Sequence, residues 1–257
     1  MASAYYRLVT RLLPEVEYHQ NKYAKELDTF LGAGHRWLDL GAGASLHGGW
    51  GGRSQADLAG RASLLVGCDM EAYSLRENPY LTAGTVADGG TLPFSDSTFD
   101  LVTANMVLEH LSDPLVVFKE IARVLRPGGR FVFVTPNRGH PAVRLLSLTL
   151  SRAARRRVAA ILENRELKEV FPTFYRANSP QAILAAAVQA NLRVVDLEAF
   201  CSFPMIKFAL PMTWLECWWI RVTLRPSLER FRSNIVGCLE RPHGALPPCD
   251  EVGGPGA

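Results

Sequence analysis

The stretch WLDLGAGAS, residues 37–45, constrains the fold most strongly, because it joins a buried-strand pattern directly to a glycine turn. The large apolar residues of its first half favour a strand that is covered on both faces. Gly41 and Gly43 can take positive φ, and they place no Cβ atom in front of the main chain. A nucleotide-like ligand can therefore approach this turn closely, as at the first turn of a doubly wound sheet.

The residues around the turn narrow the kind of ligand. Asp39 lies between apolar neighbours at the end of the predicted strand, where a carboxylate is costly to bury unless it meets donors or a cation. It either contacts a charged ligand or accepts hydrogen bonds from its own loop. Leu46 stands where a dinucleotide site has its third glycine, and the glycine-rich residues 47–53 cannot begin a helix at once. We therefore expect a ligand without a pyrophosphate.

Acidic residues follow the next two predicted strands. Asp69 follows the strand predicted at residues 62–67 and is placed to accept the hydroxyls of a ribose. Glu71 is the fallback for that role, or simply an acid in the first turn of a helix. Asp88 ends the strand predicted at residues 85–88; it either accepts the amine of an adenine or initiates a turn.

The rest of the chain alternates between strands and helices, which is typical of an α/β sheet with right-handed crossovers. Hydrophobic spacing predicts strands at residues 101–105, 130–135 and 192–199, and helices at residues 113–125 and 180–190. The helix at 180–190 would be capped by Asn178 or Ser179.

Five sequence blocks together carry a family resemblance. In chain order they are WLDLGAGAS, GCDMEAYSLRENP, VADGGTLPFSDSTFDLV, NMVLEHLSDP and FKEIARVLRPGGRFVFVTPN. This order resembles the class I S-adenosylmethionine-dependent methyltransferases, most closely the small-molecule branch with the quinone-biosynthesis and type 11 enzymes, densely over residues 35–137. The resemblance implies an α/β fold with a Rossmann-like, doubly wound, seven-stranded and mostly parallel sheet, an N-terminal helical cap and a C-terminal extension.

The resemblance also implies S-adenosyl-L-methionine as the cofactor and assigns the residues that would hold it. Asp39, Gly41 and Gly43 would line its methionine end, Asp69 its ribose, Asp88 and Gly89 its adenine, and Asn105 the floor below the sulfonium. Ala42 and Met70 are further candidates for binding the cofactor. Many relatives have the motif Gly-Cys-Gly-Thr-Gly where this chain has Gly-Ala-Gly-Ala-Ser at residues 41–45, so serine replaces the last glycine. The loop at residues 45–53 therefore either folds over the cofactor or is mobile.

Methyl transfer from a sulfonium asks the protein to align the acceptor and to exclude water, because the methyl group is already activated. A base is needed when the acceptor carries a proton that must leave. His110, beside Glu109 after the fourth strand, is the favoured base; otherwise it hydrogen-bonds its own loop. Candidate substrate contacts are Tyr18, Asn137, Tyr175 and Arg176. Packing is the favoured interpretation for Tyr18, and it explains Tyr175 and Arg176 equally well. No metal site is expected.

Four segments are expected along the chain. They are an N-terminal helical cap at residues 1–34, a methyltransferase domain at 35–200, an apolar extension at 201–241 that completes or covers the sheet, and a disordered tail at 242–257. The extension is rich in tryptophan and phenylalanine, which serve either the core or an exposed surface for a lipid-like substrate, a membrane or a second copy of the chain. The basic run at residues 152–157 is a solvated face or a site for an anionic substrate or lipid headgroup.

Composition excludes several classes of protein. A net charge of +3 without an aromatic and basic platform argues against nucleic-acid binding. Five widely spaced cysteines indicate a cytoplasmic protein without disulfides. Because no apolar run is long enough to cross a bilayer, no membrane span is expected. Two functions remain: a methyltransferase that acts on a small molecule, at oxygen in preference to carbon or nitrogen, and a non-catalytic partner subunit of the same fold. A nicotinamide dehydrogenase is a distant third.

Overall fold

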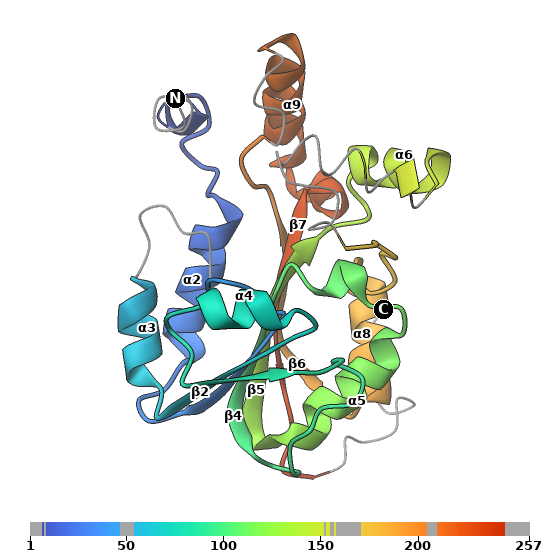
Figure 1. The fold of residues 1–257 in the computed structure, drawn as a ribbon. Helices are drawn as coiled ribbons and strands as arrows, with labels where there is room; N and C mark the ends of the chain where they lie inside the picture. The colour runs from blue at the N-terminus through green and yellow to red at the C-terminus, as the bar shows by residue number, and fades with distance from the viewer. Residues whose placement is uncertain are drawn as a thin grey trace, which may run out of the picture.

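A seven-stranded sheet forms the centre of the molecule. The computed structural model describes residues 7, 9–46, 54–151, 153, 154, 157, 171–204 and 210–244. The strand order is β3-β2-β1-β4-β5-β7-β6 (Figure 1). The strands are β1 (Arg36–Leu40), β2 (Leu64–Asp69), β3 (Ala83–Val86), β4 (Phe99–Asn105), β5 (Leu125–Pro136), β6 (Arg193–Phe200) and β7 (Asn234–Glu240). Only β7 runs antiparallel to its neighbours. The predicted fold class is confirmed.

Helices cover both faces of this sheet. The helices of the described residues are α2 (His19–Phe30), α3 (Gln55–Arg61), α4 (Ala72–Glu77), α5 (Pro114–Val124), α6 (Pro141–Thr149), α8 (Pro180–Gln189) and α9 (Leu210–Thr223), with the 3-10 helices η1 (Leu108–His110) and η3 (Pro226–Phe231). Buried residues of α2 and α3 pack on one face, and those of α5 and α8 on the other. Ser179 caps α8 by accepting a hydrogen bond from the Ala182 amide, as one of the two predicted caps.

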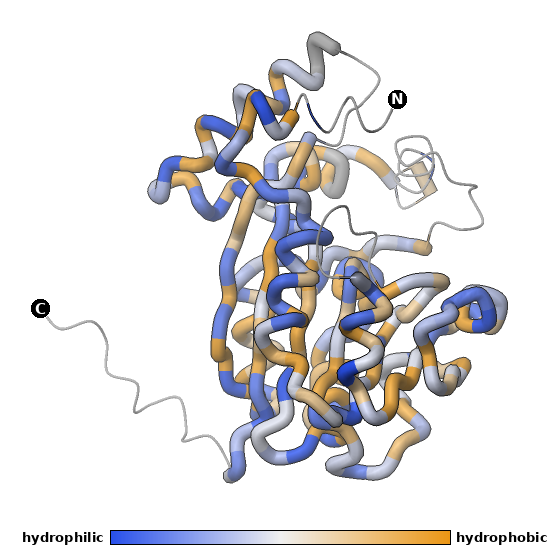
Figure 2. The backbone as a smooth tube through the Cα atoms, turned by 90° about the vertical axis from the view of Figure 1, so that its left-hand side faces the viewer, coloured by the Kyte–Doolittle hydropathy of each residue, from blue (hydrophilic) through white to orange (hydrophobic). Residues whose placement is uncertain are grey.

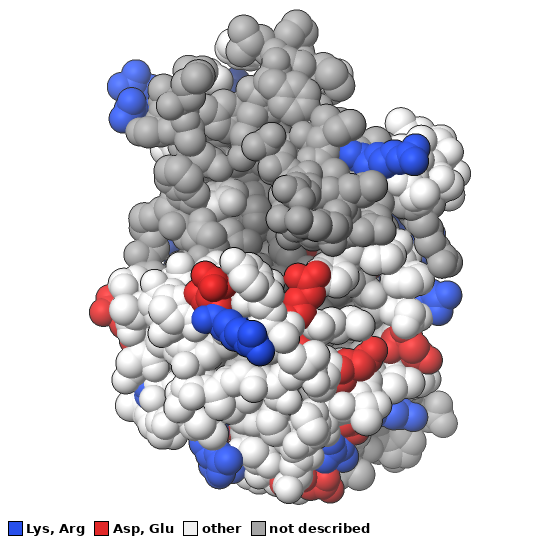
Figure 3. Space-filling model, in the orientation of Figure 1, with Lys and Arg blue, Asp and Glu red and all other residues white. Residues whose placement is uncertain are grey.

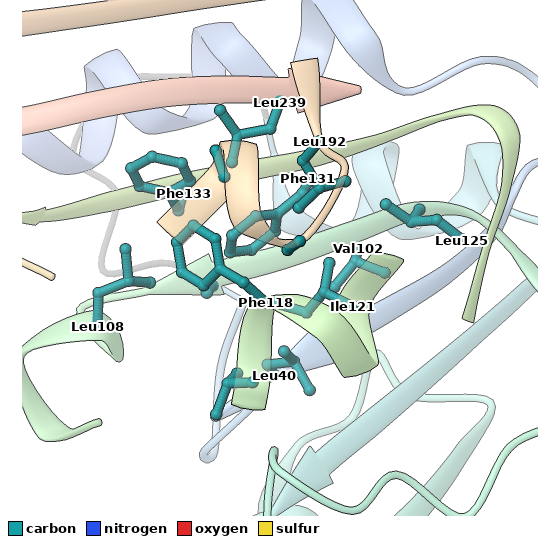
Figure 4. Packing of buried hydrophobic residues seen from close by; sticks show 14 of the residues in the cluster. Leu40, Val102, Leu108, Phe118, Ile121, Leu125, Phe131, Phe133, Leu192 and Leu239 are labelled. Atoms are coloured by element: carbon teal, nitrogen blue, oxygen red, sulfur yellow. The ribbon is translucent and has the colours of Figure 1, made fainter. Parts of the chain in front are cut away.

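The two faces of the sheet have separate cores because side chains alternate along each strand. On the α5 face, the rings of Phe118 and Phe131 meet edge to face with centroids 5.7 Å apart (Figure 4). On the α2 face, Trp37 is completely buried beside Tyr23 and Leu27. The continuous apolar runs of the central strands follow from burial on both sides.

Several element boundaries differ from the sequence prediction: β2 begins and ends two residues later than predicted, and β4 begins two residues earlier. β3 begins and ends two residues earlier than predicted, so Asp88 lies beyond the strand. β5 begins at Leu125 because the Pro-Gly-Gly turn is looped out: pairing passes from Phe99 with Leu125 directly to Leu101 with Arg130. β7, which had not been predicted as a separate strand, pairs between β5 and β6. The division of the chain into four segments stays a prediction.

The carboxyl ends of the parallel strands meet at one edge, which lies at the top of Figure 1. The chain leaves β1 toward β2 on one side and returns through β4 on the other, and ligands bind at such a switch point. Helices α6 and α9 follow β5 and β6, and both rise above this edge (Figures 1 and 2). None of the helices in the described residues is long and apolar enough to cross a membrane.

Candidate active site

The glycine turn after β1 folds back onto the end of β2. Gly41 has φ +64° and Gly43 has φ +47°, both in the left-handed region. The amides of Gly41 and Ala42 donate to the carbonyl of Cys68 at 2.7 and 3.3 Å. A Cβ atom on Gly41 would lie 2.5 Å from Cγ2 of Val107. Glycine is therefore required at position 41 both by the backbone angle and by the close approach of Val107.

Asp69 holds this turn from the end of β2. Its Oδ2 accepts a hydrogen bond from the Gly43 amide at 3.0 Å, and its Oδ1 accepts one from the Glu71 amide at 2.9 Å. Each carboxylate oxygen has a second lone pair, so Asp69 can still accept two hydroxyl groups. Met70, the next residue, is exposed. The geometry suits the predicted ribose site.

Asn78, which sequence reasoning missed, is a second brace for the turn. It is buried at the end of α4, and its Nδ2 donates to the carbonyls of Ala42 and Gly43 at 3.2 and 3.3 Å. Its Oδ1 accepts from the Tyr80 amide at 3.2 Å. The only sequence signal was its place before Pro79, where a helix is expected to end.

Asp39 is a buried carboxyl held by a chain of hydrogen bonds. The indole Nε1 of Trp37 donates to Oγ1 of Thr103 at 2.7 Å, and this hydroxyl donates to Oδ1 of Asp39 at 2.6 Å. Burial raises the pKa of Asp39 to about 7, opposed by the bond from Thr103 and assisted by the charge of Asp69. Thr103 was also missed, although a polar residue inside an apolar strand was a readable signal.

Asn105, at the end of β4, is bound to the N-terminal helix. Its side-chain amide exchanges two hydrogen bonds with Gln20 of α2, at 2.7 and 3.0 Å. Its Nδ2 also lies 3.4 Å from the carbonyl of Leu46. Gln20 is buried, and nothing in its sequence context indicated this contact. Helix α2 is thereby fixed beside the predicted sulfonium position.

The loop after β3 is a compact turn. Oδ1 of Asp88 accepts a hydrogen bond from the Gly90 amide at 2.7 Å, and the Asp88 carbonyl accepts from the Thr91 amide. Gly89 lies over the side chain of Val117. These bonds support the turn interpretation of Asp88; contact of Asp88 and Gly89 with an adenine stays a prediction.

His110 lies in η1 under the segment at residues 171–176. Its Nδ1 is 2.9 Å from the carbonyl oxygen of Pro172. Because a carbonyl only accepts, Nδ1 carries the hydrogen and Nε2 of the neutral ring is left as a proton acceptor. The amides of Phe174 and Tyr175 donate to the carbonyl of Glu109 at 2.7 and 3.2 Å, which holds the segment on η1.

The side chain of Glu109 is buried and braces the ends of β4 and β5. Its Oε2 accepts a hydrogen bond from Oγ1 of Thr135 at 3.0 Å. The Thr135 hydroxyl oxygen in turn accepts one from Nδ2 of Asn178 at 2.7 Å. These contacts favour a positioning role for Glu109, and the catalytic role of His110 stays a prediction.

The four predicted substrate contacts fall into different places. Tyr175 and Arg176 belong to the segment over η1. Tyr175 has φ +53°, and the Arg176 guanidinium donates to the carbonyl of Ser112. Asn137 is buried, and its amide bonds the backbone of Gly139, Arg230 and Arg232, which favours a structural role. Tyr18 packs its ring against His19 and Phe203.

Some predictions fall on residues outside the described part of the chain. They are the loop at residues 47–53, Arg152, Arg155, Arg156, Phe208, and the tail from residue 245 onward. Cys68, Cys201, Cys217 and Cys238 are buried free thiols. Among the described residues, no group of three or more histidine, cysteine or acidic side chains is arranged to hold a metal ion.

Comparison with known proteins matches the site's residues to one family. Residues 38–133 match the family model described as "Methyltransferase domain". The demethylmenaquinone methyltransferase of Mycobacterium sp. (strain KMS) is 33% identical over 164 residues, which are 62% of this chain and 68% of that protein. That of Corynebacterium kroppenstedtii is 38% identical over 107 residues, 40% of this chain and 44% of the relative, so the match spans less than half of its length.

A solved structure shares the fold. The S-adenosylmethionine dependent methyltransferase from Mesorhizobium loti aligns with a TM-score of 0.54 at 19% identity, over 85% of this chain and 95% of that chain. The alignment extends the likeness beyond the segment that the family model matches.

Replacement of Gly41 by alanine tests the turn. Gly41→Ala should lower the free energy of unfolding by about 1–3 kcal/mol, because a left-handed residue gains a Cβ atom against Val107. Gly60→Ala, in α3 with open space around its Cα, should be neutral or stabilising by up to about 1 kcal/mol. Urea unfolding measures both, and equal effects at the two glycines would contradict the assignment.

The pKa of Asp39 predicts a pH-dependent stability. The folded chain keeps the proton of Asp39 up to about pH 7, whereas the unfolded chain loses it near pH 4. The contribution of Asp39 to the free energy of unfolding is therefore complete below about pH 4 and is lost as the pH rises to 7. The slope is about 1.4 kcal/mol per pH unit. Asp39→Asn should remove this contribution and so make the free energy of unfolding less dependent on pH between pH 5 and pH 7, in urea unfolding without ligand, since asparagine stays neutral. The exposed Asp57→Asn is the control, and an unchanged slope in Asp39→Asn would refute the prediction.

Proposed function

Since this chain belongs to the class I S-adenosylmethionine-dependent methyltransferases, we propose that it transfers a methyl group from S-adenosyl-L-methionine to an oxygen of a small-molecule acceptor. The observation that carries the proposal is the glycine turn held by Asp69, at the switch point between β1 and β4. The demethylmenaquinone methyltransferases among its relatives support a small organic acceptor.

The residues of the site fit the cofactor. Gly41 and Gly43 open the backbone to close approach, and Asp69 retains acceptor capacity for two ribose hydroxyls. Met70 offers an exposed apolar side chain next to it. Asp39 is a buried carboxyl with a raised pKa, and an ammonium group at the methionine end would favour its charged form.

The chemistry divides between cofactor and protein. When bound, the cofactor supplies a methyl group already activated by its sulfonium. His110 then acts through Nε2, which takes the proton from the acceptor hydroxyl as the oxygen gains the methyl group. The carbonyl of Pro172, bonded to Nδ1, fixes the ring orientation and stabilises the imidazolium that forms. Glu109 keeps η1 against β5 through Thr135. The segment at residues 171–176 covers η1 and helps to exclude water.

Cofactor binding tests the first half of the proposal. Calorimetry should show binding of S-adenosyl-L-methionine and S-adenosylhomocysteine and none of NAD. Asp69→Asn should weaken binding by about 1–3 kcal/mol, because it removes the charge and one acceptor oxygen from the ribose site. Glu71→Gln, two residues away and exposed, should leave the affinity unchanged.

If Glu71→Gln weakened cofactor binding and Asp69→Asn left it unchanged, Glu71 would be the residue that binds the ribose. If neither sulfur compound binds, the alternative function, a non-catalytic partner subunit, would be favoured. The altered glycine motif ending at Ser45 is the sequence feature that motivates this alternative.

Turnover tests the role of His110. Methyl transfer from labelled cofactor into fractionated cell extract identifies the acceptor, and with that fraction His110→Ala should lower kcat by about a hundredfold or more. The affinity for the cofactor should stay normal. His243→Ala, at an exposed site beyond β7, is the matched control. A loss of kcat well below a hundredfold would assign His110 a structural role.

A further inference from the structure

Two helices above the carboxyl edge expose large apolar side chains. Leu145 and Leu148 of α6, and Trp214, Leu215 and Trp218 of α9, are each between 58% and 69% exposed. We call these five residues the cap surface. On α9, the neighbouring residues Cys217 and Ile220 are buried against the N-terminal segment, whereas Trp214 and Trp218 lie on the outward side of the helix. The cap surface is therefore a face of the fold without a described partner.

The two helices belong to one continuous surface. Trp219 of α9 has its ring centroid 6.5 Å from that of His140, just before α6, and 6.3 Å from that of Phe231 in η3. Phe231 also lines an open apolar hollow of about 400 Å³. The other residues that line the hollow are Gly139, Pro141, Arg144, Leu145 and Leu148. Apolar groups thus extend from α6 through the hollow to α9.

The charge around the cap surface is basic. Arg11, Arg221 and Arg225 are exposed, and none forms an ion pair with an acidic residue of the described part. The acids closest in sequence to them are Glu15, the half-buried Glu216 and the exposed Glu229 of η3. On the face drawn in Figure 3, the described charged side chains above the level of α4 are basic, whereas the acidic ones lie at that level or below.

We propose that the cap surface docks the protein on a lipid bilayer that contains anionic lipids. Tryptophan suits the boundary between headgroups and acyl chains, because its ring is apolar and its N–H is polar. Arginines beside it add attraction to anionic headgroups. A second copy of the chain fits less well, because a two-fold contact would bring the same basic residues face to face. The helix lies on the membrane and does not span it.

Docking would place the site toward the bilayer. Helices α6 and α9 follow strands whose carboxyl ends form the same edge as Glu109 and His110. An acceptor dissolved in the membrane would then approach from the side where the segment at residues 171–176 covers η1. The docking itself does not depend on methyl transfer and is tested without it.

Vesicle co-sedimentation of the full chain tests the proposal. The protein should pellet with vesicles of equal parts phosphatidylglycerol and phosphatidylcholine, and much less with phosphatidylcholine alone. Trp214→Ser combined with Trp218→Ser should weaken binding at least about tenfold, because these exposed rings supply the buried apolar area. Arg11→Gln and Arg225→Gln should each weaken it by about fivefold. Leu184→Ser with Val188→Ser, exposed on α8, is the matched control and should bind as the unmodified chain.

Folding of each variant is checked by thermal unfolding and by its affinity for S-adenosylhomocysteine, which should not change. Failure of the unmodified chain to bind the anionic vesicles overturns the proposal, and so does equal binding by the double tryptophan variant. A dimer in analytical ultracentrifugation that the double tryptophan variant converts to monomer, without vesicle binding, would overturn it in favour of a second copy. Cofactor binding with no vesicle binding would leave the proposed function intact while rejecting this docking.

Discussion

The hydrogen bond from the Gly43 amide to Asp69 is the contact on which the site depends. It joins the ends of β1 and β2, where backbone groups no longer have partners in the sheet. The left-handed backbone at Gly41 and Gly43 turns the Gly43 amide toward Asp69. Asn78 holds the same turn by donating to the carbonyls of Ala42 and Gly43. The two braces come from the last residue of β2 and from the end of α4, so two separate side chains hold the turn.

Sequence patterns predicted the parts of the fold that local chemistry determines. The strands ending at the glycine turn and at Asn105, and the helix that begins after Asp113, follow from hydrophobic runs and capping residues. The position of β7 did not follow, because its insertion between β5 and β6 is a choice among distant partners. The apolar residues after Phe200 were equally ambiguous: most of them form α9, and the last strand comes later in the chain.

The same limit applies to the site. Asp39, Asp69 and Asn105 could be found because parallel strands bring their carboxyl ends to one edge. Gln20 and Asn78 could not, since their partners lie 85 and 36 positions away in the chain. Thr103 differs from both, because a hydroxyl inside an apolar strand needs a partner, and Asp39 on the neighbouring strand was available.

The environment of Asp39 bears on whether the site is used. A carboxyl whose pKa is raised to about 7 by burial, next to a second carboxylate at Asp69, costs stability at neutral pH. A neutral asparagine would accept the Thr103 hydrogen bond without that cost. The cost is offset if a cationic group binds near both acids, because the charged form of Asp39 is then favoured. This balance favours a chain that binds S-adenosyl-L-methionine over a partner subunit that has lost it, since a subunit without the cofactor would keep the penalty and gain nothing in return.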